Sequence, residues 1–283
     1  MQSQENGNPI AMGNDPSEKQ KKLAARLRVL GSAVVAFSGG ADSAYLAWMA
    51  HQTLGERALA ITALSPSFSE FDRQQAGAFA RKENLQHEFV ETHEFENPLY
   101  VMNQADRCYH CKTELFGVLA KLRAARGFEA VTYGVNTDET KDFRPGHRAA
   151  SEFGVVAPLL DAGLTKAEIR ELSRRAGLAT WDRPASACLS SRVPYGMPVT
   201  LENLSRIERA ESALREHGFR QVRVRSHGEL ARIEIAPDEL PRALQGDLAE
   251  ALTERIRETG FTYVMLDPEG YRQGSLNAAL KKK

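Results

Sequence analysis

Short apolar runs alternate with longer amphipathic segments over the first half of the chain. The runs that we interpret as strands are residues 33–37, 58–64, 88–92 and 130–135. The segments with apolar side chains at helical spacing, which we interpret as helices, are residues 23–30, 68–84 and 112–127. This alternation predicts an α/β fold, in which a parallel sheet has helices on both faces and binds ligands at the carboxyl ends of its strands. The loops that should converge there are 38–43, 65–69 and 136–142.

The last third of the chain has a different pattern. It predicts a helix, two alternating strands, a mostly helical stretch and a last strand, at 201–217, 221–226, 230–236, 238–259 and 261–266. These elements form a small α+β unit. We therefore expect three regions: a disordered tail over 1–17, an α/β domain over 18–196, and a smaller C-terminal α+β domain over 197–283.

Composition and charge are those of a soluble enzyme. The chain has 283 residues, of which 42% are hydrophobic, and a formal net charge of +0. Balanced charge gives no general attraction to nucleic acid or to an anionic membrane, and no apolar run approaches the roughly 18 residues that span a bilayer. The polar start of the chain has no hydrophobic core, so it is not read as a signal peptide and a cytoplasmic location is expected. Three cysteines, an odd number, argue against a disulfide framework.

The first apolar run leads directly into a glycine-containing loop and then a helix. The loop residues are Ser38, Gly39, Gly40, Asp42 and Ser43. Two adjacent glycines let the backbone approach an anion closely, and the amides at the start of the helix stabilise its charge. The loop lacks the lysine of a Walker motif and the third glycine of a dinucleotide motif. It is therefore interpreted as a phosphate loop of another kind, with an ordinary turn as the alternative.

Acidic and basic side chains follow in later loops. Phosphate chemistry needs a divalent cation, and the candidate oxygen ligands for Mg²⁺ are Asp42, Asp138, Glu139 and Asp142. Each of these acids also fits a solvated loop. Farther on, Lys166 begins a helix with a capping-box pattern, where it could contact phosphate or remain a surface charge.

The cysteines form a second group of candidate residues. Cys108 and Cys111 are a close pair, and Cys188 is distant in the sequence. With His110 they could complete a four-ligand zinc site. Three thiolates without a fourth ligand would leave an open position, which is useful on an iron–sulfur cluster, and three unligated cysteines are the third interpretation.

Two arginines lie two residues apart on a predicted C-terminal strand. Arg223 and Arg225 therefore face the same side, and Val222 and Val224 face the other. Paired guanidinium groups can bind a phosphate with two hydrogen bonds each. The alternative is a charged, solvated face of the sheet.

Together these motifs carry a resemblance that runs from about residue 23 to residue 277. The loop at Ser38 resembles the pyrophosphate loop of the ATP pyrophosphatase superfamily, whose members cleave ATP to AMP and pyrophosphate. The remaining motifs occur in the family's order, at 108–111, 134–146, 188–196 and 222–225. The chain resembles the sulfur transferases that make the nickel-pincer cofactor of lactate racemase, which adenylate both carboxylates of pyridinium-3,5-biscarboxylic acid mononucleotide and convert them to thiocarboxylates.

The resemblance implies roles for individual residues. The implied ATP-binding residues are Ala36, Phe37, Ser38, Gly39, Gly40, Asp42, Ser43, Ala63, Gly134 and Lys166. The implied catalytic residues are Cys108, Cys111, Cys188 and Glu139, with Asp42 and Asp138 on Mg²⁺. The implied substrate-phosphate site consists of Arg192, Arg223, Arg225 and Glu211.

The family has two sources of sulfur, and the cysteine pattern bears on the choice. Some members sacrifice one cysteine, which aligns with Ala187 here, whereas others hold a 4Fe–4S cluster on three cysteines and use exogenous sulfide. Cys108, Cys111 and Cys188 match the second type, although Cys188 could itself supply sulfur.

The resemblance also implies partners and leaves alternatives. The implied partners are the small-molecule substrate, sulfide, other enzymes of the same cofactor pathway and further copies of the chain in a dimer or hexamer. One alternative is a tRNA-thiolating enzyme of the same superfamily, which would need a basic surface for RNA. Another is a nucleotide-binding regulator that has lost catalysis.

Overall fold

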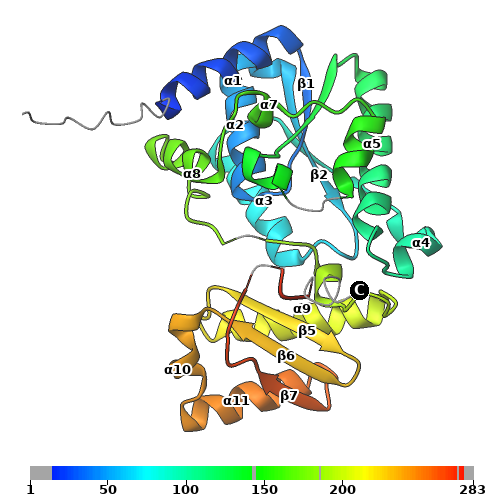
Figure 1. The fold of residues 1–283 in the computed structure, drawn as a ribbon, viewed down its shortest axis with the longest axis vertical. Helices are drawn as coiled ribbons and strands as arrows, with labels where there is room; N and C mark the ends of the chain where they lie inside the picture. Colours follow the sequence, from blue (N-terminus) through cyan, green and yellow to red (C-terminus); the bar gives the residue numbers. More distant parts are fainter. Residues whose placement is uncertain (1–14, 142–144, 185, 273, 277–283) are drawn as a thin grey trace, which may run out of the picture.

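The computed structural model describes residues 15–141, 145–184, 186–272 and 274–276. Figure 1 shows two lobes that meet at a narrow waist. The large lobe contains the elements from α1 to α8 and the small lobe those from α9 to β7. A connecting segment, residues 176–200, joins them and carries the short helix η4 (Leu189–Arg192).

The large lobe is built on a four-stranded parallel sheet. Its strands are β1 (Ala33–Ala36), β2 (Ala58–Leu64), β3 (His87–Glu91) and β4 (Ala130–Tyr133). Their order is β3-β2-β1-β4, so β1 has β2 as its neighbour on one edge and β4 on the other. Loops after the central strands therefore separate at their carboxyl ends, the usual place for a ligand in such a sheet.

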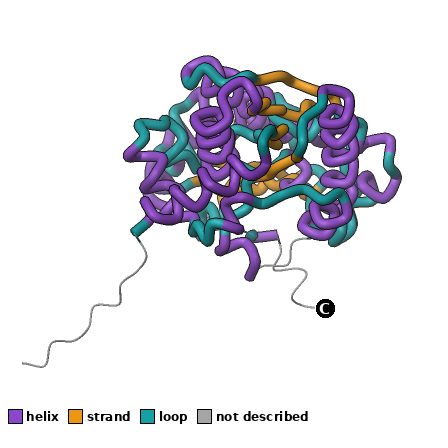
Figure 2. The backbone as a smooth tube through the Cα atoms, turned by 90° about the horizontal axis from the view of Figure 1, so that it is seen from above, coloured by secondary structure: helices purple, strands orange, loops and turns teal. Residues whose placement is uncertain are grey.

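Helices cover both faces of this sheet, as Figure 2 shows from above. One face is covered by α1 (Pro16–Leu30), α2 (Ala41–Leu54), α3 (Glu70–Lys82) and α8 (Lys166–Arg175). The other is covered by α5 (Arg107–Arg126) and α6 (Gly146–Glu152). Alternate residues of β1 supply the two cores, since Ala33 and Val35 pack on the first face and Val34 on the second. Two single-turn helices, α4 (Pro98–Val101) and α7 (Pro158–Asp161), complete this lobe.

The small lobe packs a three-stranded sheet against helices. Its elements are α9 (Leu201–Glu216), β5 (Val222–His227), β6 (Leu230–Ile235), α10 (Leu240–Ala243), α11 (Gly246–Arg257) and β7 (Tyr263–Leu266). Strands β5 and β6 are antiparallel, and β7 pairs parallel to β6. Val222 and Val224 of β5 lie in the core with Leu204 and Ile207 of α9.

The predicted fold class is confirmed, and two helices begin at least five residues earlier than predicted. Helix α5 begins at Arg107 and not at Lys112, so the cysteine pair lies in its first turns. Helix α1 begins at Pro16, because Asp15 caps it, so residues 16 and 17 of the predicted tail are helical. Residues 1–14 and Asp142 lie outside the described residues. Among the described helices, none is both long and apolar enough to cross a membrane.

Candidate functional site

The loop between β1 and α2, residues 36–43, is called the nucleotide loop. Gly39 has a positive φ of 73°, which favours glycine, and Gly40 caps α2 in an extended conformation. Ser43 closes the loop because its Oγ accepts a hydrogen bond from the backbone N–H of Ser38 at 3.2 Å and donates one to the carbonyl of Gly40 at 3.1 Å. The first turn of α2 therefore faces the loop, as a phosphate site requires.

Gly134 brings the end of β4 against this loop. A Cβ atom at this position would lie 2.8 Å from both the backbone nitrogen and the Cα of Ser43. Because real side chains do not approach backbone atoms so closely, only glycine fits without a shift of either segment. Gly134, a second predicted ATP-binding segment, therefore lies directly beside the nucleotide loop.

The segment Asn136–Glu139 is called the acidic loop, and it contacts the same helix start. Asn136 Nδ2 donates to Asp42 Oδ2 at 3.1 Å. The backbone N–H of Lys166, at the start of α8, donates to Asp138 Oδ2 at 2.8 Å. Lys166 Nζ lies 3.9 Å from Asp42 Oδ2. Two carboxylates and one ammonium group from separate loops therefore meet at the carboxyl edge of the sheet, where oxygen ligands for Mg²⁺ and a cation for phosphate were predicted.

The remaining candidates of the large lobe lie at the same edge. Ala36 and Ala63 are half-buried at the ends of β1 and β2. Phe37 donates its N–H to the carbonyl of Ile61 at 2.8 Å. Glu139 lies half-buried on the short helix η3 (Thr137–Lys141). Burial raises the pKa of Tyr133, and the Glu139 charge adds to this rise, so Glu139 faces the end of β4.

The structure brings the three cysteines to one region. Cys108 and Cys111 lie in the first turns of α5, and Cys188 directly precedes η4. All three are free thiols. Burial raises the pKa of the Cys111 thiol, and the charges of Glu94 and Cys188 add to the rise. The three cysteines therefore lie in one region, where the start of α5 and the segment before η4 meet.

The three thiols are the soft ligands that an iron–sulfur cluster uses, so the residue types fit such a group. Within the ranges that the structure describes, however, no three His, Cys, Asp or Glu side chains are arranged to hold a metal ion. His110 Nε2 lies 3.4 Å from Asp106 Oδ2, one turn back on its own helix. Nothing in the described residues therefore adds His110 to the cysteines as a zinc ligand.

Arg107 lies beside the cysteines and was not among the predicted residues. Its side chain is buried and donates to Asn103 Oδ1 and to the carbonyl of Ser190. Burial alone would lower the pKa of Arg107, but the neighbouring Cys188 and Cys108, with Tyr100 and Tyr195, outweigh it, so this pKa is raised. Its position directly before the cysteine pair was the only signal in the sequence.

Residues 186–192 are called the cysteine loop, and Arg192 fastens this loop to the small lobe. Its guanidinium, which is 2% exposed, contacts both oxygens of Glu211 on α9 at 2.8 and 3.0 Å. Its remaining nitrogen donates to the carbonyls of Ala187 and Cys188. Arg192 thus joins the backbone of Cys188 directly to the predicted phosphate site.

Glu211 is the acidic centre of this site. It also contacts Arg215 at 2.8 Å and accepts a hydrogen bond from the backbone N–H of Val224. Burial opposes ionisation of this carboxyl, but Arg192 outweighs burial, with help from Arg223 and Arg215, so its pKa falls to about 2. Glu211 is therefore a carboxylate at neutral pH.

The two arginines of β5 have different surroundings. Arg225 forms hydrogen bonds of 2.7 and 3.1 Å with Glu234 Oε2 and donates to the carbonyl of Ser191 in the cysteine loop. Arg223 lies over the ring of Tyr271 at 5.3 Å. Burial lowers its pKa to about 10, and the positive charge of Arg192 adds to this effect. Arg223 therefore lies in a desolvated place near the guanidinium of Arg192, where an added anion would be stabilised. Glu234, which is fully buried, was missed because its contact with Arg225 arises only when β6 pairs with β5, where Glu234 lies opposite Arg223.

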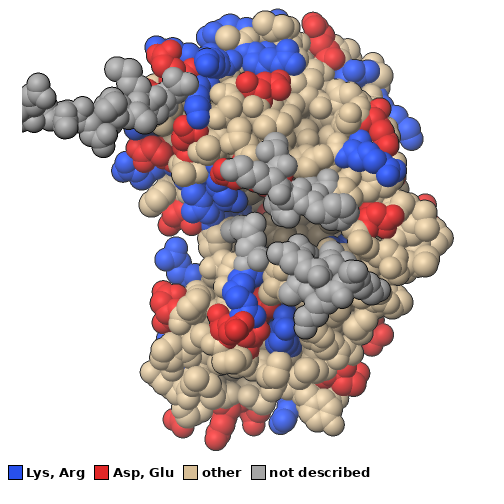
Figure 3. All heavy atoms as spheres, viewed as in Figure 1, with Lys and Arg blue, Asp and Glu red and all other residues tan. Residues whose placement is uncertain are grey.

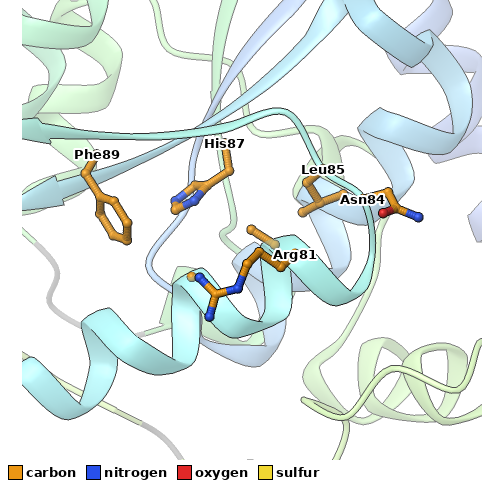
Figure 4. Close-up of a pocket in the computed structure, with 7 residues that line it drawn as sticks. Arg81, Asn84, Leu85, His87 and Phe89 are labelled. Carbon is orange, nitrogen blue, oxygen red and sulfur yellow. The ribbon is translucent and has the colours of Figure 1, made fainter.

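On the face shown in Figure 3, the molecule narrows between the lobes, and Lys and Arg side chains lie on both sides of the narrowing. A cavity of about 550 Å³ lies elsewhere, between α3 and the edge strand β3. Figure 4 shows His87 and Phe89 of β3 facing Arg81 there. No predicted site residue lines this cavity.

Comparisons with known proteins show the family to which the chain belongs. No family model matches the chain. An uncharacterised protein of Synechocystis is 45% identical over 253 residues, which are 89% of this chain and 94% of the relative. The pyridinium-3,5-bisthiocarboxylic acid mononucleotide synthase of Lactiplantibacillus plantarum is 35% identical over 273 residues, 93% of this chain and 95% of the synthase. The chain belongs to the family of this synthase. A more distant relative is an uncharacterised protein of Methanocaldococcus jannaschii. It is 29% identical over 239 residues, which are 84% of this chain and 90% of the relative.

Proposed function

We propose that this chain is an enzyme that uses ATP to activate the carboxylates of pyridinium-3,5-biscarboxylic acid mononucleotide and converts them to thiocarboxylates. The product would serve the nickel-pincer cofactor of lactate racemase. Support for the substrate comes from the relative of the same family, whose name states the bisthiocarboxylic acid mononucleotide as its product. Support for the chemistry comes from the contacts of the chain's own residues.

The nucleotide loop and the acidic loop would carry the activation step. The amides of Gly39 and Gly40 and the first turn of α2 would bind the phosphates of ATP. Asp42 and Asp138 would hold Mg²⁺, and Lys166 would neutralise phosphate charge. A substrate carboxylate oxygen attacks the α-phosphorus, pyrophosphate leaves, and an acyl adenylate remains.

The cysteine loop would carry the second step. A sulfur nucleophile attacks the acyl carbon, and AMP leaves with one carboxylate oxygen, so each thiocarboxylate consumes one ATP and one sulfide. Cys108, Cys111 and Cys188 would hold a 4Fe–4S cluster, which when bound supplies an iron with an open position for exogenous sulfide. Arg107 would stabilise the negative charge that thiolates and sulfide bring to this buried place.

Arg192, Arg223, Arg225 and Glu211 form what we call the arginine site, which would hold the phosphate of the substrate. The observation that carries the proposal is the double role of Arg192, which binds Glu211 of the small lobe and the carbonyls of Ala187 and Cys188. A substrate whose phosphate lies at Arg223 would therefore lie beside the cysteine loop. Such an arrangement positions a bound carboxylate for attack by sulfur.

The test is a mass-spectrometric assay with the anaerobically reconstituted protein, Mg–ATP, sulfide and the substrate, in which product and intact protein mass are read from one tube. Repeated formation of thiocarboxylate with unchanged protein mass supports the cluster route. Product limited to one sulfur per chain, with the mass of hydrogen sulfide lost from the protein, would mean that Cys188 is consumed. Absence of thiocarboxylate from fully reconstituted protein refutes the proposal, and the same sample would then be assayed for tRNA thiolation.

A pair of matched variants isolates the activation step. Asp42 and Asp247 are each the second residue of a helix, α2 and α11 respectively. Asp42→Asn should abolish substrate-dependent release of pyrophosphate, because the Mg²⁺ ligand is lost. Asp247→Asn removes a charge at the same helix position and should leave the rate unchanged.

A further inference from the structure

A buried ion pair lies between the nucleotide loop and the cysteine loop. Arg183 follows α8 in the connecting segment, and its side chain is 12% exposed. Its Nη1 donates to the carbonyl of Gly39 at 2.7 Å, and its Nη2 contacts Asp72 Oδ1 at 2.9 Å. One guanidinium therefore bridges the nucleotide loop and the first turn of α3.

Asp72 extends this connection to the cysteine loop. Its second oxygen, Oδ2, accepts hydrogen bonds from Ser69 Oγ at 2.7 Å and from Ser186 Oγ at 2.8 Å. Ser69 is also the cap of α3, since its Oγ accepts a hydrogen bond from the backbone N–H of Asp72. Both carboxylate oxygens are thus used, and Ser186 lies two residues before Cys188.

The contacts leave little room for the nucleotide loop to move alone. A Cβ atom on Gly39 would lie 3.2 Å from Cβ of Ala76 on α3 and 3.4 Å from Nη1 of Arg183. The loop therefore packs directly on the ion pair and on α3. Because the guanidinium and the carboxylate are both largely buried, solvent screens their attraction little, and the geometry of their hydrogen bonds is well defined.

We propose that Arg183 and Asp72 are positioning residues that set the cysteine loop relative to the nucleotide loop. We call this connection, Gly39–Arg183–Asp72–Ser186, the latch. The inference rests on the proposed function, because it assigns ATP to one end of the latch and sulfur transfer to the other. Adenylation needs only the bond from Arg183 to Gly39, whereas sulfur transfer needs the complete latch. Nucleotide that holds residues 36–43 in place therefore also restrains residues 186–192 through the latch.

Hydrogen exchange of the full-length protein without nucleotide tests the latch directly. Ser186→Ala removes only the last bond, which is partly buried. Exchange should therefore become up to roughly tenfold faster in residues 186–192 and stay unchanged in 36–43, as expected for loss of one hydrogen bond. Arg183→Met should accelerate exchange in both segments. Arg183→Lys, which keeps the positive charge on a single donor nitrogen, should restore part of the protection. Arg73→Met is the matched control, because Arg73 on α3 forms an exposed pair with Glu70 and should change neither segment.

Hydrogen exchange with bound nucleotide and the kinetics of each reaction step supply a second test. With α,β-methylene ATP and Mg²⁺, residues 186–192 should become protected in the wild type and in Arg73→Met but not in Ser186→Ala. Ser186→Ala should keep the KM for ATP and the rate of pyrophosphate release, while thiocarboxylate formation falls roughly tenfold. Arg183→Met should also raise the KM for ATP.

The outcomes separate this inference from the proposed function. Equal exchange in wild type, Ser186→Ala and Arg183→Met overturns the latch, even if the wild type makes thiocarboxylate. Wild-type protein that forms no adenylate contradicts the proposed function, and the nucleotide-free exchange pattern then still decides whether the latch couples the two loops. If Arg183→Met does not fold, Ser186→Ala and Arg183→Lys carry the same comparison.

Discussion

Substitution of Glu211 by Gln removes the central negative charge of the arginine site while keeping the size of the side chain and one acceptor oxygen. Glu211 is fully buried and contacts Arg192 and Arg215. Breaking a buried ion pair by removing one partner costs roughly 3–5 kcal/mol. An independent estimate follows from the pKa of Glu211, which is lowered from 4.5 to about 2. At about 1.4 kcal/mol per pH unit, this difference corresponds to about 3 kcal/mol.

The sign of the pH dependence follows from the same shift. A carboxyl whose pKa is lower in the folded state stabilises the fold above its ordinary pKa, and this contribution is lost as the pH falls toward the folded value. Wild type should therefore be more stable than Glu211→Gln by about 3 kcal/mol at pH 7. The difference should narrow as the pH falls from 4.5 toward 2.

Urea unfolding of both proteins at pH 7 and at a series of values down to about pH 3 measures this difference. Glu171→Gln is the matched control, because Glu171 also contacts two arginines but its side chain is 33% exposed on α8, where solvent screens the pairs. Its unfolding midpoint should hardly change. Equal losses in the two variants, or a difference from wild type that stays constant over the pH series, would show that burial does not strengthen the Glu211 contacts.

Three further predictions concern the large lobe and the sulfur site. Gly134→Ala should raise the KM for ATP and lower the rate of pyrophosphate release about 100-fold, because the added methyl group displaces the nucleotide loop. The control is Gly246→Ala, where a Cβ atom meets nothing within 4 Å, and it should leave both quantities unchanged. Removal of iron by an anaerobic chelator should stop thiocarboxylate formation but not pyrophosphate release, and continued sulfur transfer without iron would exclude the cluster. Arg107→Met should weaken retention of the reconstituted cluster more than Arg107→Lys, measured by visible absorbance during dilution, and equal retention would show that the charge of Arg107 is not needed.

Several features of the large lobe were predictable because their causes are local. The apolar run of β1, the two glycines and the start of α2 follow one another without interruption, so spacing alone indicates a strand, a phosphate loop and a helix. The same holds for β5, where a period of two puts Val222 and Val224 in the core and the two arginines on the opposite face. The start of α5 was placed too late, because the sequence Arg107 to Lys112 has no apolar periodicity of its own and is helical through its contacts with other segments.

The sequence by itself determined the fold class, the nucleotide loop, the identity of the three cysteines and the arginine pair, since residue type and short spacing suffice for each. Only the tertiary structure decided what these groups contact. Arg192 and Arg225 are ion-paired with Glu211 and Glu234, and Arg183 reaches Gly39 across 144 residues of sequence. Such contacts depend on the order of the strands, on how the connecting segment passes between the two lobes, and on the burial that removes water from each charge. The spacing of residues along the chain determines none of these.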